Sequence, residues 1–83
     1  PELEKRWRRL MAKLQPKVEP WDFKHWLMPI TIAGWVDESV VLGVPDESHG
    51  DYVREHYGEA IDGAWRSVGA SSPLRYEPYA RLG

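Results

Sequence analysis

The chain has 83 residues, a net charge of −2 and no cysteine. This length predicts one small domain over residues 1–83, with room for a single core and little for a deep substrate cleft. The lack of cysteine excludes disulfides and thiolate chemistry, and no apolar run approaches the roughly 20 residues of a membrane span. The sequence also shows no charged and apolar leader, so we expect a soluble cytoplasmic protein.

Charge is distributed unevenly along the sequence. Residues 1–17 carry six basic side chains against two acidic ones, whereas residues 37–62 carry eight acidic side chains against one basic side chain. Such a polarised chain is suited to head-to-tail association, or to partners of opposite charge at its two ends. The simpler alternative is that most of these charges lie on solvated helix faces.

The first residues predict an amphipathic helix that ends at Pro16. The apolar residues on its inner face are Leu3, Trp7, Leu10, Met11 and Leu14. Basic residues fall between them and give the helix a cationic outer side. A tryptophan on such an apolar face is, by composition alone, a core residue.

A second, short helix is predicted after Pro20, which is tolerated in a first helical turn because its missing N–H is not needed there. Phe23, Trp26 and Leu27 share one face of this helix and are expected in the core, since a short helix is held by the face it buries. Trp21 lies off that face, and the spacing leaves open whether it packs or is exposed. The helix ends before Pro29.

The sequence period changes after Pro29. Two short β-branched runs, residues 30–35 and 39–44, flank a segment of turn composition and predict a hairpin. Pro45 stops the second strand, and Asp46 or Ser48 is expected to cap the helix that follows.

A third helix is predicted by a helical spacing of apolar residues that continues to Val68. The residues on its inner face are Val53, Tyr57, Ala60, Ile61, Ala64, Trp65 and Val68. Three glycines weaken this helix and leave its start uncertain. Residues 74–79 predict a last strand, which Pro78 ends or places at a sheet edge. The expected fold is therefore α+β in the order ααββαβ, with a three-stranded sheet packed against helices.

Four sequence motifs occur in order along the chain. They are Trp7…Met11…Leu14-Gln15, Phe23-x-x-Trp26-Leu27-x-Pro29-Ile30, Val44-Pro45-Asp46, and Asp51-Tyr52-Val53-x-x-x-Tyr57-x-x-x-Ile61. In this order and spacing they resemble the N-terminal domain of the bacterial replication initiator DnaA. Three positions depart from the family pattern: Asp46 replaces an asparagine, Ser48 an aromatic residue and Tyr52 a tryptophan.

The resemblance implies a non-enzymatic interaction module that mediates self-association and recruits the replicative helicase and regulators at the origin. Self-association is then expected at Trp7, with Leu3 and Leu10 beside it. The residues expected to contact the helicase or regulators are Asp22, Trp21, His25, Ser48 and Tyr52. For Asp22 the alternative role is a favourable acid in the first helical turn.

Ser48 cannot supply the aromatic area that the family carries at its position. The partner surface is then expected to have moved to Tyr52, His49 or Trp35, or else the partner has diverged. A third alternative is a DnaA-like domain attached to another replication protein.

Single-stranded nucleic acid is the alternative ligand, because the ααββαβ order also resembles the KH type. The basic residues available for a weak contact are Arg6, Arg8, Arg9 and Lys13. The chain lacks the Gly-x-x-Gly loop of a KH domain, and its negative charge disfavours phosphate. We expect no cofactor, no catalytic motif and no metal site, since His25, His49 and His56 lack the tight spacing of zinc ligands.

Overall fold

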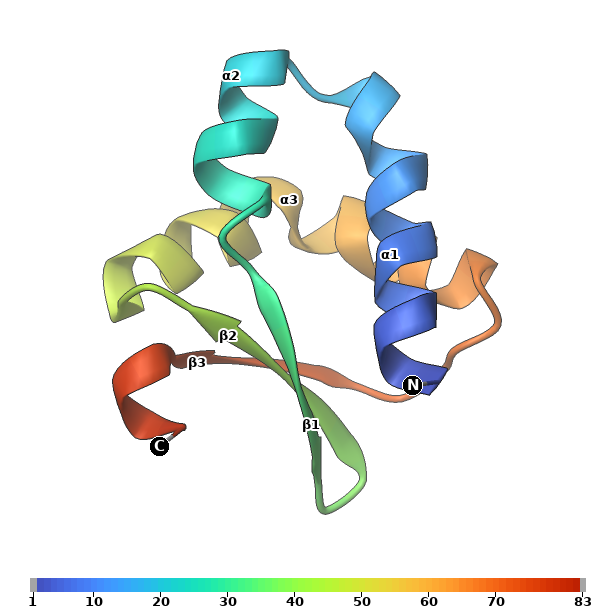
Figure 1. The fold of residues 1–83 in the computed structure, drawn as a ribbon, viewed down its shortest axis with the longest axis vertical. Helices are drawn as coiled ribbons and strands as arrows, with labels where there is room; N and C mark the ends of the chain where they lie inside the picture. The colour runs from blue at the N-terminus through green and yellow to red at the C-terminus, as the bar shows by residue number, and fades with distance from the viewer. Residues whose placement is uncertain (1, 83) are drawn as a thin grey trace.

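The computed structural model describes residues 2–82, whose elements follow the predicted order (Figure 1). The helices are α1 (Glu2–Leu14), α2 (Pro20–Asp22) and α3 (Glu47–Ser67), and the strands are β1 (Thr31–Val36), β2 (Ser39–Val44) and β3 (Leu74–Pro78). Helix α2 continues directly into a π-helical turn at Phe23–Leu27. Short 3-10 turns follow α1 at Gln15–Lys17 and β3 at Tyr79–Arg81. The predicted α+β class is confirmed.

Strand β2 lies in the centre of the three-stranded sheet, antiparallel to β1 and parallel to β3. A parallel pair needs a long crossover, and α3 provides it between β2 and β3. Pro78 is the last residue of the edge strand β3 and pairs with Val44. The edge position expected for this proline is confirmed, because a residue without an N–H is tolerated there.

The hairpin between β1 and β2 turns at Asp37 and Glu38, and Val36 pairs with Ser39. Asp37 has a φ of 56°, a left-handed conformation that aspartate tolerates better than most residues. The register shifts between Ile32 and Gly34, so β1 contains a bulge. A bulge bends an edge strand and hinders its pairing with another chain.

Helix α3 runs above the sheet and behind α1 in Figure 1 and packs against β2 and β3, whereas α1 packs against α3 and β1. The side chains with an exposed fraction of 0% are Leu10, Leu27, Val40, Leu42, Val53 and Ile61. Trp7 joins them in the core with an exposed fraction of 7%. The interior between α1, α3 and the sheet therefore holds most of the apolar residues that the sequence periodicity predicts to be buried.

Two expectations about the core were wrong in part. Trp26 was expected beside Phe23 and Leu27, which are buried, but it packs against the core from the border and is only partly buried. The π-helical turn is wider than an α-helical one, and this changes which side chains share a face. Ala60 was expected on the inner face of α3 and is exposed, because its position falls at the margin of that face.

Both ends of α3 are fixed by residues outside its apolar face. At the start, the Asp46 side chain accepts a hydrogen bond from the His49 backbone N–H, as expected for a cap. Gly50, one turn later, is buried, and a Cβ built on it would lie 3.1 Å from Val44 Cγ2. Glycine therefore allows the first turn of α3 to approach the end of β2.

The C-terminal end of α3 closes with a Schellman motif. The Gly69 N–H donates to the Arg66 carbonyl at 3.0 Å, and the Ala70 N–H donates to the Trp65 carbonyl at 3.1 Å. Arg6 of α1 donates a further hydrogen bond from Nη1 to the Val68 carbonyl at 2.8 Å. A cation thus lies where the helix dipole is negative, and it joins α1 to the end of α3.

A glycine-to-alanine pair tests this helix end. Gly69 has a φ of +90°, and an added Cβ would lie 2.9 Å from Arg6 Nη1. We expect Gly69→Ala to lower the free energy of unfolding by about 1–2 kcal/mol. The matched control is Gly63→Ala inside α3, where an added Cβ meets nothing within 4 Å; it should raise the same quantity by about 0.5–1 kcal/mol. Urea denaturation measures the free energy of unfolding of both variants. Equal effects would contradict the role given to the left-handed backbone of Gly69.

Candidate functional site

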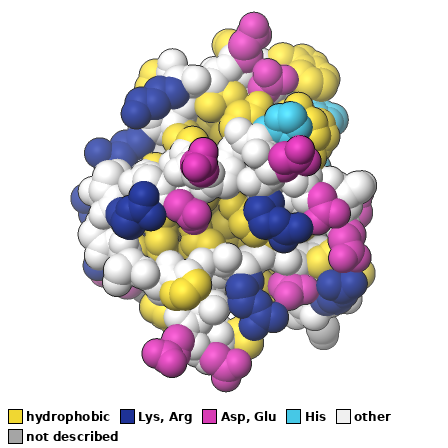
Figure 2. Space-filling view, turned by 180° about the vertical axis from the view of Figure 1, so that it is seen from behind, with side chains coloured by type: hydrophobic (Ala, Val, Ile, Leu, Met, Phe, Trp, Pro, Cys, Tyr) yellow, Lys and Arg dark blue, Asp and Glu magenta, His cyan; other side chains and the backbone are white. Residues whose placement is uncertain are grey.

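A row of aromatic and histidine rings runs across the surface where α2 and its π-helical turn meet α3. Its members, called the aromatic row below, are Trp21, His25, Trp26, His49, Tyr52 and His56. Three come from residues 20–27 and three from the first half of α3. Figure 2 shows histidine side chains beside hydrophobic side chains on this face, with acidic side chains around them.

The rings of the aromatic row stack on one another. Trp21 stacks on His25 with ring centroids 4.6 Å apart, and Tyr52 stacks on His56 at 4.0 Å. Both pairs are four residues apart, the spacing that brings side chains together on one side of a helical segment. Trp26 joins the two segments, because it stacks on Tyr52 at 3.8 Å with an interplanar angle of 15°.

His49 fixes the middle of the row. Its ring lies 4.9 Å from that of Trp26, and its Nε2 lies 2.9 Å from the Trp26 carbonyl oxygen. The nitrogen donates in this bond, since a carbonyl oxygen only accepts. The bond satisfies a carbonyl near the C-terminal end of the π-helical turn and fastens that turn to α3.

The outer part of the row is open to solvent. Trp21 has an exposed fraction of 64%, while Trp26 and Tyr52 are partly buried. Beside the row lies a depression of about 520 Å³, whose lining residues are Trp21, Lys24, His25, Pro29, Pro45 and His49. The surface therefore combines rigid stacked rings with a hollow that can accept a side chain.

Asp22 lies at the border of the aromatic row, near α3. Burial, and then the negative charge of Asp22, raise the pKa of the Tyr57 hydroxyl. Asp22 itself is partly buried, and on α3 the carboxylates of Asp51 and Glu55 are exposed next to the row. Asp51 is paired with Arg54 at 2.8 Å, and Lys24 lines the depression, so this border carries acidic side chains together with two cations.

Ser48 does not belong to the aromatic row. Its hydroxyl donates to Asp46 Oδ1 at 2.9 Å, next to the hydrogen bond that Asp46 receives from His49. The His49 backbone N–H, and then the Ser48 hydroxyl, lower the pKa of the Asp46 carboxyl. Serine at this position thus supports the helix cap, and the neighbouring residue, His49, supplies the ring.

The residues expected to bind partners are brought together only in part. Trp21, His25 and Tyr52 lie in the aromatic row, Asp22 borders it and Ser48 lies in the cap. Sequence analysis missed Trp26, which was assigned to the core, and His56, which was considered only as a metal ligand. The signal that identifies His56 is its four-residue distance from Tyr52.

The α1 residues divide into interior and exterior sets. Of the three expected to support self-association, Trp7 and Leu10 are buried and Leu3 is partly exposed. Arg6 was expected among the nucleic-acid contacts. Its Nη1 donates to the Val68 carbonyl, and its Nε lies 3.5 Å from Glu2 Oε2. The basic side chains that remain exposed on α1 are Lys5, Arg8, Arg9 and Lys13.

Within residues 2–82, no group of three or more histidine, aspartate or glutamate side chains is placed to hold a metal ion. In the same range, no helix is both long and apolar enough to cross a membrane.

The Asp46 cap gives a test with a defined pH dependence. Because the folded-state pKa of Asp46 is lowered, its charge stabilises the fold above the unfolded value, near 3.8, and the contribution disappears as pH falls through the folded pKa. We expect Asp46→Ala to lower Tm at pH 7, and Asp46→Asn, which still caps, to lower it less. The difference between wild type and Asp46→Asn should vanish in acid. A constant difference from pH 7 to below 3 would contradict this role.

Comparison with known proteins identifies the family. A model of the DnaA N-terminal domain matches residues 4–67, which include the whole aromatic row. The chromosomal replication initiator protein DnaA of Deinococcus radiodurans is 31% identical over 67 residues, which cover 81% of this chain and 14% of that relative. This chain therefore matches only a small part of the full length of that relative. On the extent of the family match, the chain belongs to the DnaA N-terminal domain family.

Proposed function

We propose that this chain is the interaction domain of a replication initiator and recruits the replicative helicase, or the regulators of initiation, through the aromatic row. The observation that carries the proposal is the stack of rings that joins α2 to α3 and leaves Trp21 64% exposed. In this role the domain acts as a non-catalytic adaptor in the cytoplasm. Family membership supports the replication context.

The chemistry of the row suits a protein partner. Tryptophan and tyrosine provide large, rigid contact areas and are enriched where most of the binding energy of an interface is concentrated. The stack holds its rings in place before binding, so little conformational freedom is lost when a partner docks. The depression beside Trp21 offers a place for an anchoring side chain.

The charges around the row favour protein over nucleic acid. Asp22 and Glu55 lie along its border and, among residues 2–82, form no ion pair, whereas Asp51 is paired with Arg54. Carboxylates repel phosphate. The whole chain has a net charge of −2. We therefore expect the partner surface to be apolar at its centre and basic at its rim.

Self-association is the second part of the proposal, and we place it on α1. The buried positions of Trp7 and Leu10 direct the contact to side chains near them, namely Leu3 and the exposed basic residues. A patch on so small a domain gives a weak contact at or below about 800 Å² per partner. Several initiators held at one origin would compensate by avidity.

A pair of variants at exposed apolar residues tests recruitment. We expect Trp21→Ala to weaken binding to the replicative helicase of the same organism by about tenfold or more, as for a central interface tryptophan. The matched control is Leu82→Ala, because Leu82 is 40% exposed but belongs neither to the row nor to the hairpin. Calorimetric titration measures both affinities, and circular dichroism verifies the folds. Unchanged binding by Trp21→Ala, or an equal loss in both variants, would refute the proposal.

A further inference from the structure

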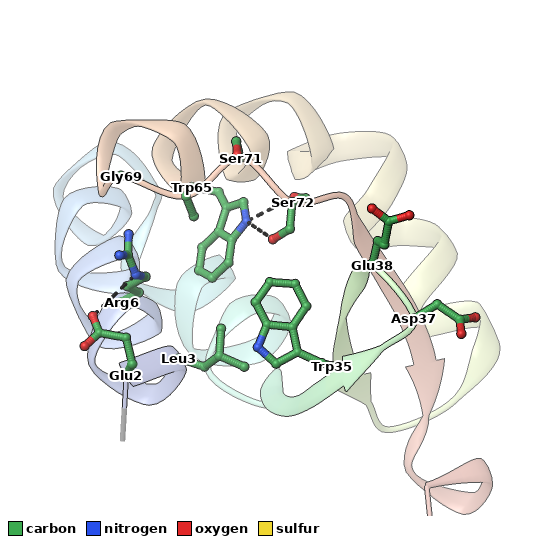
Figure 3. A pocket seen from close by; sticks show the side chains of 11 residues that line it. Glu2, Leu3, Arg6, Trp35, Asp37, Glu38, Trp65, Gly69, Ser71 and Ser72 are labelled. Atoms are coloured by element: carbon green, nitrogen blue, oxygen red, sulfur yellow. Dashed lines mark hydrogen bonds and ion pairs between the residues drawn. The ribbon is translucent and has the colours of Figure 1, made fainter.

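A second concave surface lies at the other end of α3, between the tip of the β1–β2 hairpin and the start of α1. It is a cleft of about 590 Å³ with a tryptophan on each side, Trp35 of β1 and Trp65 of α3 (Figure 3). The aromatic row does not contribute to it. The proposed recruitment of a helicase leaves this cleft unused.

The two tryptophans differ in exposure and in hydrogen bonding. Trp65 is 2% exposed, and its Nε1 donates to the carbonyl and the hydroxyl of Ser72 at 3.2 and 3.3 Å. Trp35 pairs with Val40, whose side chain is in the core, so its indole extends over the end of the core and remains 59% exposed. Trp65 thus forms a fixed wall, and Trp35 offers a free indole face.

The charge lining the cleft is negative. Glu2, Asp37 and Glu38 contribute carboxylates. Among residues 2–82 the one cation in the lining is Arg6, which pairs with Glu2 and donates to the Val68 carbonyl. Within residues 2–82, neither Asp37 nor Glu38 forms a hydrogen bond or ion pair. An exposed indole beside free carboxylates favours a cationic side chain, which stacks on the ring and pairs with the acids.

The same chain carries the complementary surface. The outer face of α1 presents Lys5, Arg8, Arg9 and Lys13 to solvent, and among the described residues Lys5, Arg9 and Lys13 form no ion pair. We propose that the Trp35–Trp65 cleft of one copy receives the basic outer face of α1 of a second copy. This inference rests on the proposed self-association and names the surface that accepts α1.

The geometry of this contact has a consequence for assembly. The cleft and the outer face of α1 are different surfaces of one molecule, so the contact is heterologous and leaves one of each surface free at the two ends. Copies then add head to tail into an open row. A symmetric contact of α1 with α1 would stop at a dimer.

Two variants with one inactive surface each test the inference. The cleft variant combines Trp35→Ala, Asp37→Asn and Glu38→Gln, where asparagine suits the left-handed backbone at position 37. The helix variant combines Arg8→Gln and Arg9→Gln. We expect sedimentation of wild type up to about 1 mM to show growth beyond a dimer that high salt suppresses. Each variant alone should associate at least about tenfold more weakly.

The equimolar mixture of the two variants is the decisive sample. The intact cleft of the helix variant should bind the intact α1 of the cleft variant, giving a heterodimer that cannot grow. Two charge-matched controls outside the row, the cleft and α1 should assemble like wild type: Glu19→Gln with Glu59→Gln, and Lys17→Gln with Arg66→Gln. Circular dichroism verifies that all variants fold.

The outcomes separate this inference from the proposed function. A mixture that stays monomeric, or either variant assembling like wild type, overturns the head-to-tail contact while leaving self-association intact. In that case a basic peptide of another protein replaces α1 as the candidate occupant of the cleft. Wild type that stays monomeric at every concentration overturns both the contact and the self-association, and it leaves helicase recruitment standing.

Discussion

The burial of one face of α3 is the constraint on which both surfaces of this domain depend. A helix of 21 residues is about 31 Å long, close to the longest extent of the domain, 32 Å. Val53 and Ile61 fix it against the sheet and the first two helices. The N-terminal half of α3 then presents His49, Tyr52 and His56 to the aromatic row, and its C-terminal half presents Trp65 to the cleft.

The short second helix shows how function and stability share residues. A helical segment of eight residues does not hold its conformation alone. Phe23 and Leu27 anchor it in the core, and Trp26 anchors it on α3 through Tyr52 and His49. The Met28 N–H reaches back to the Phe23 carbonyl at 2.9 Å, which closes the π-helical turn. Such turns are frequent at functional sites, and here the turn places Trp21 on a support that is already fixed.

Local sequence signals were sufficient for the order of the elements and for most of their ends. The spacing of apolar residues, the prolines at 16, 20, 29 and 78, and the capping Asp46 are each interpretable within a few residues of chain, and the structure confirms them. The interactions that sequence analysis missed join distant segments. Arg6 binds a carbonyl 62 residues away, and Trp26 stacks on Tyr52 from another helix. No periodicity encodes such pairs.

Trp26 and Trp7 show why an aromatic residue is hard to assign from spacing alone. Trp26 was placed inside because an α-helical period puts it beside Phe23 and Leu27, and the wider π-helical turn moves it to the border, where its ring is available to the row. Trp7 lies on the apolar stripe of α1 and is in fact interior, although the family resemblance suggested a surface role. Large apolar rings stabilise a small core as readily as they form an interface.

The separation of the two surfaces along α3 bears on how weak contacts could act together. A copy whose cleft and α1 are engaged by its neighbours would still present its aromatic row, because the row lies around the opposite end of α3. Each added copy would then add one site for the recruited partner, at a spacing set by the contact between copies. For a partner with several binding sites, such as a ring of subunits, affinity would increase steeply with the number of aligned copies, without any single contact being strong. Weak individual contacts also keep the assembly reversible, since dissociation of one neighbour costs little free energy.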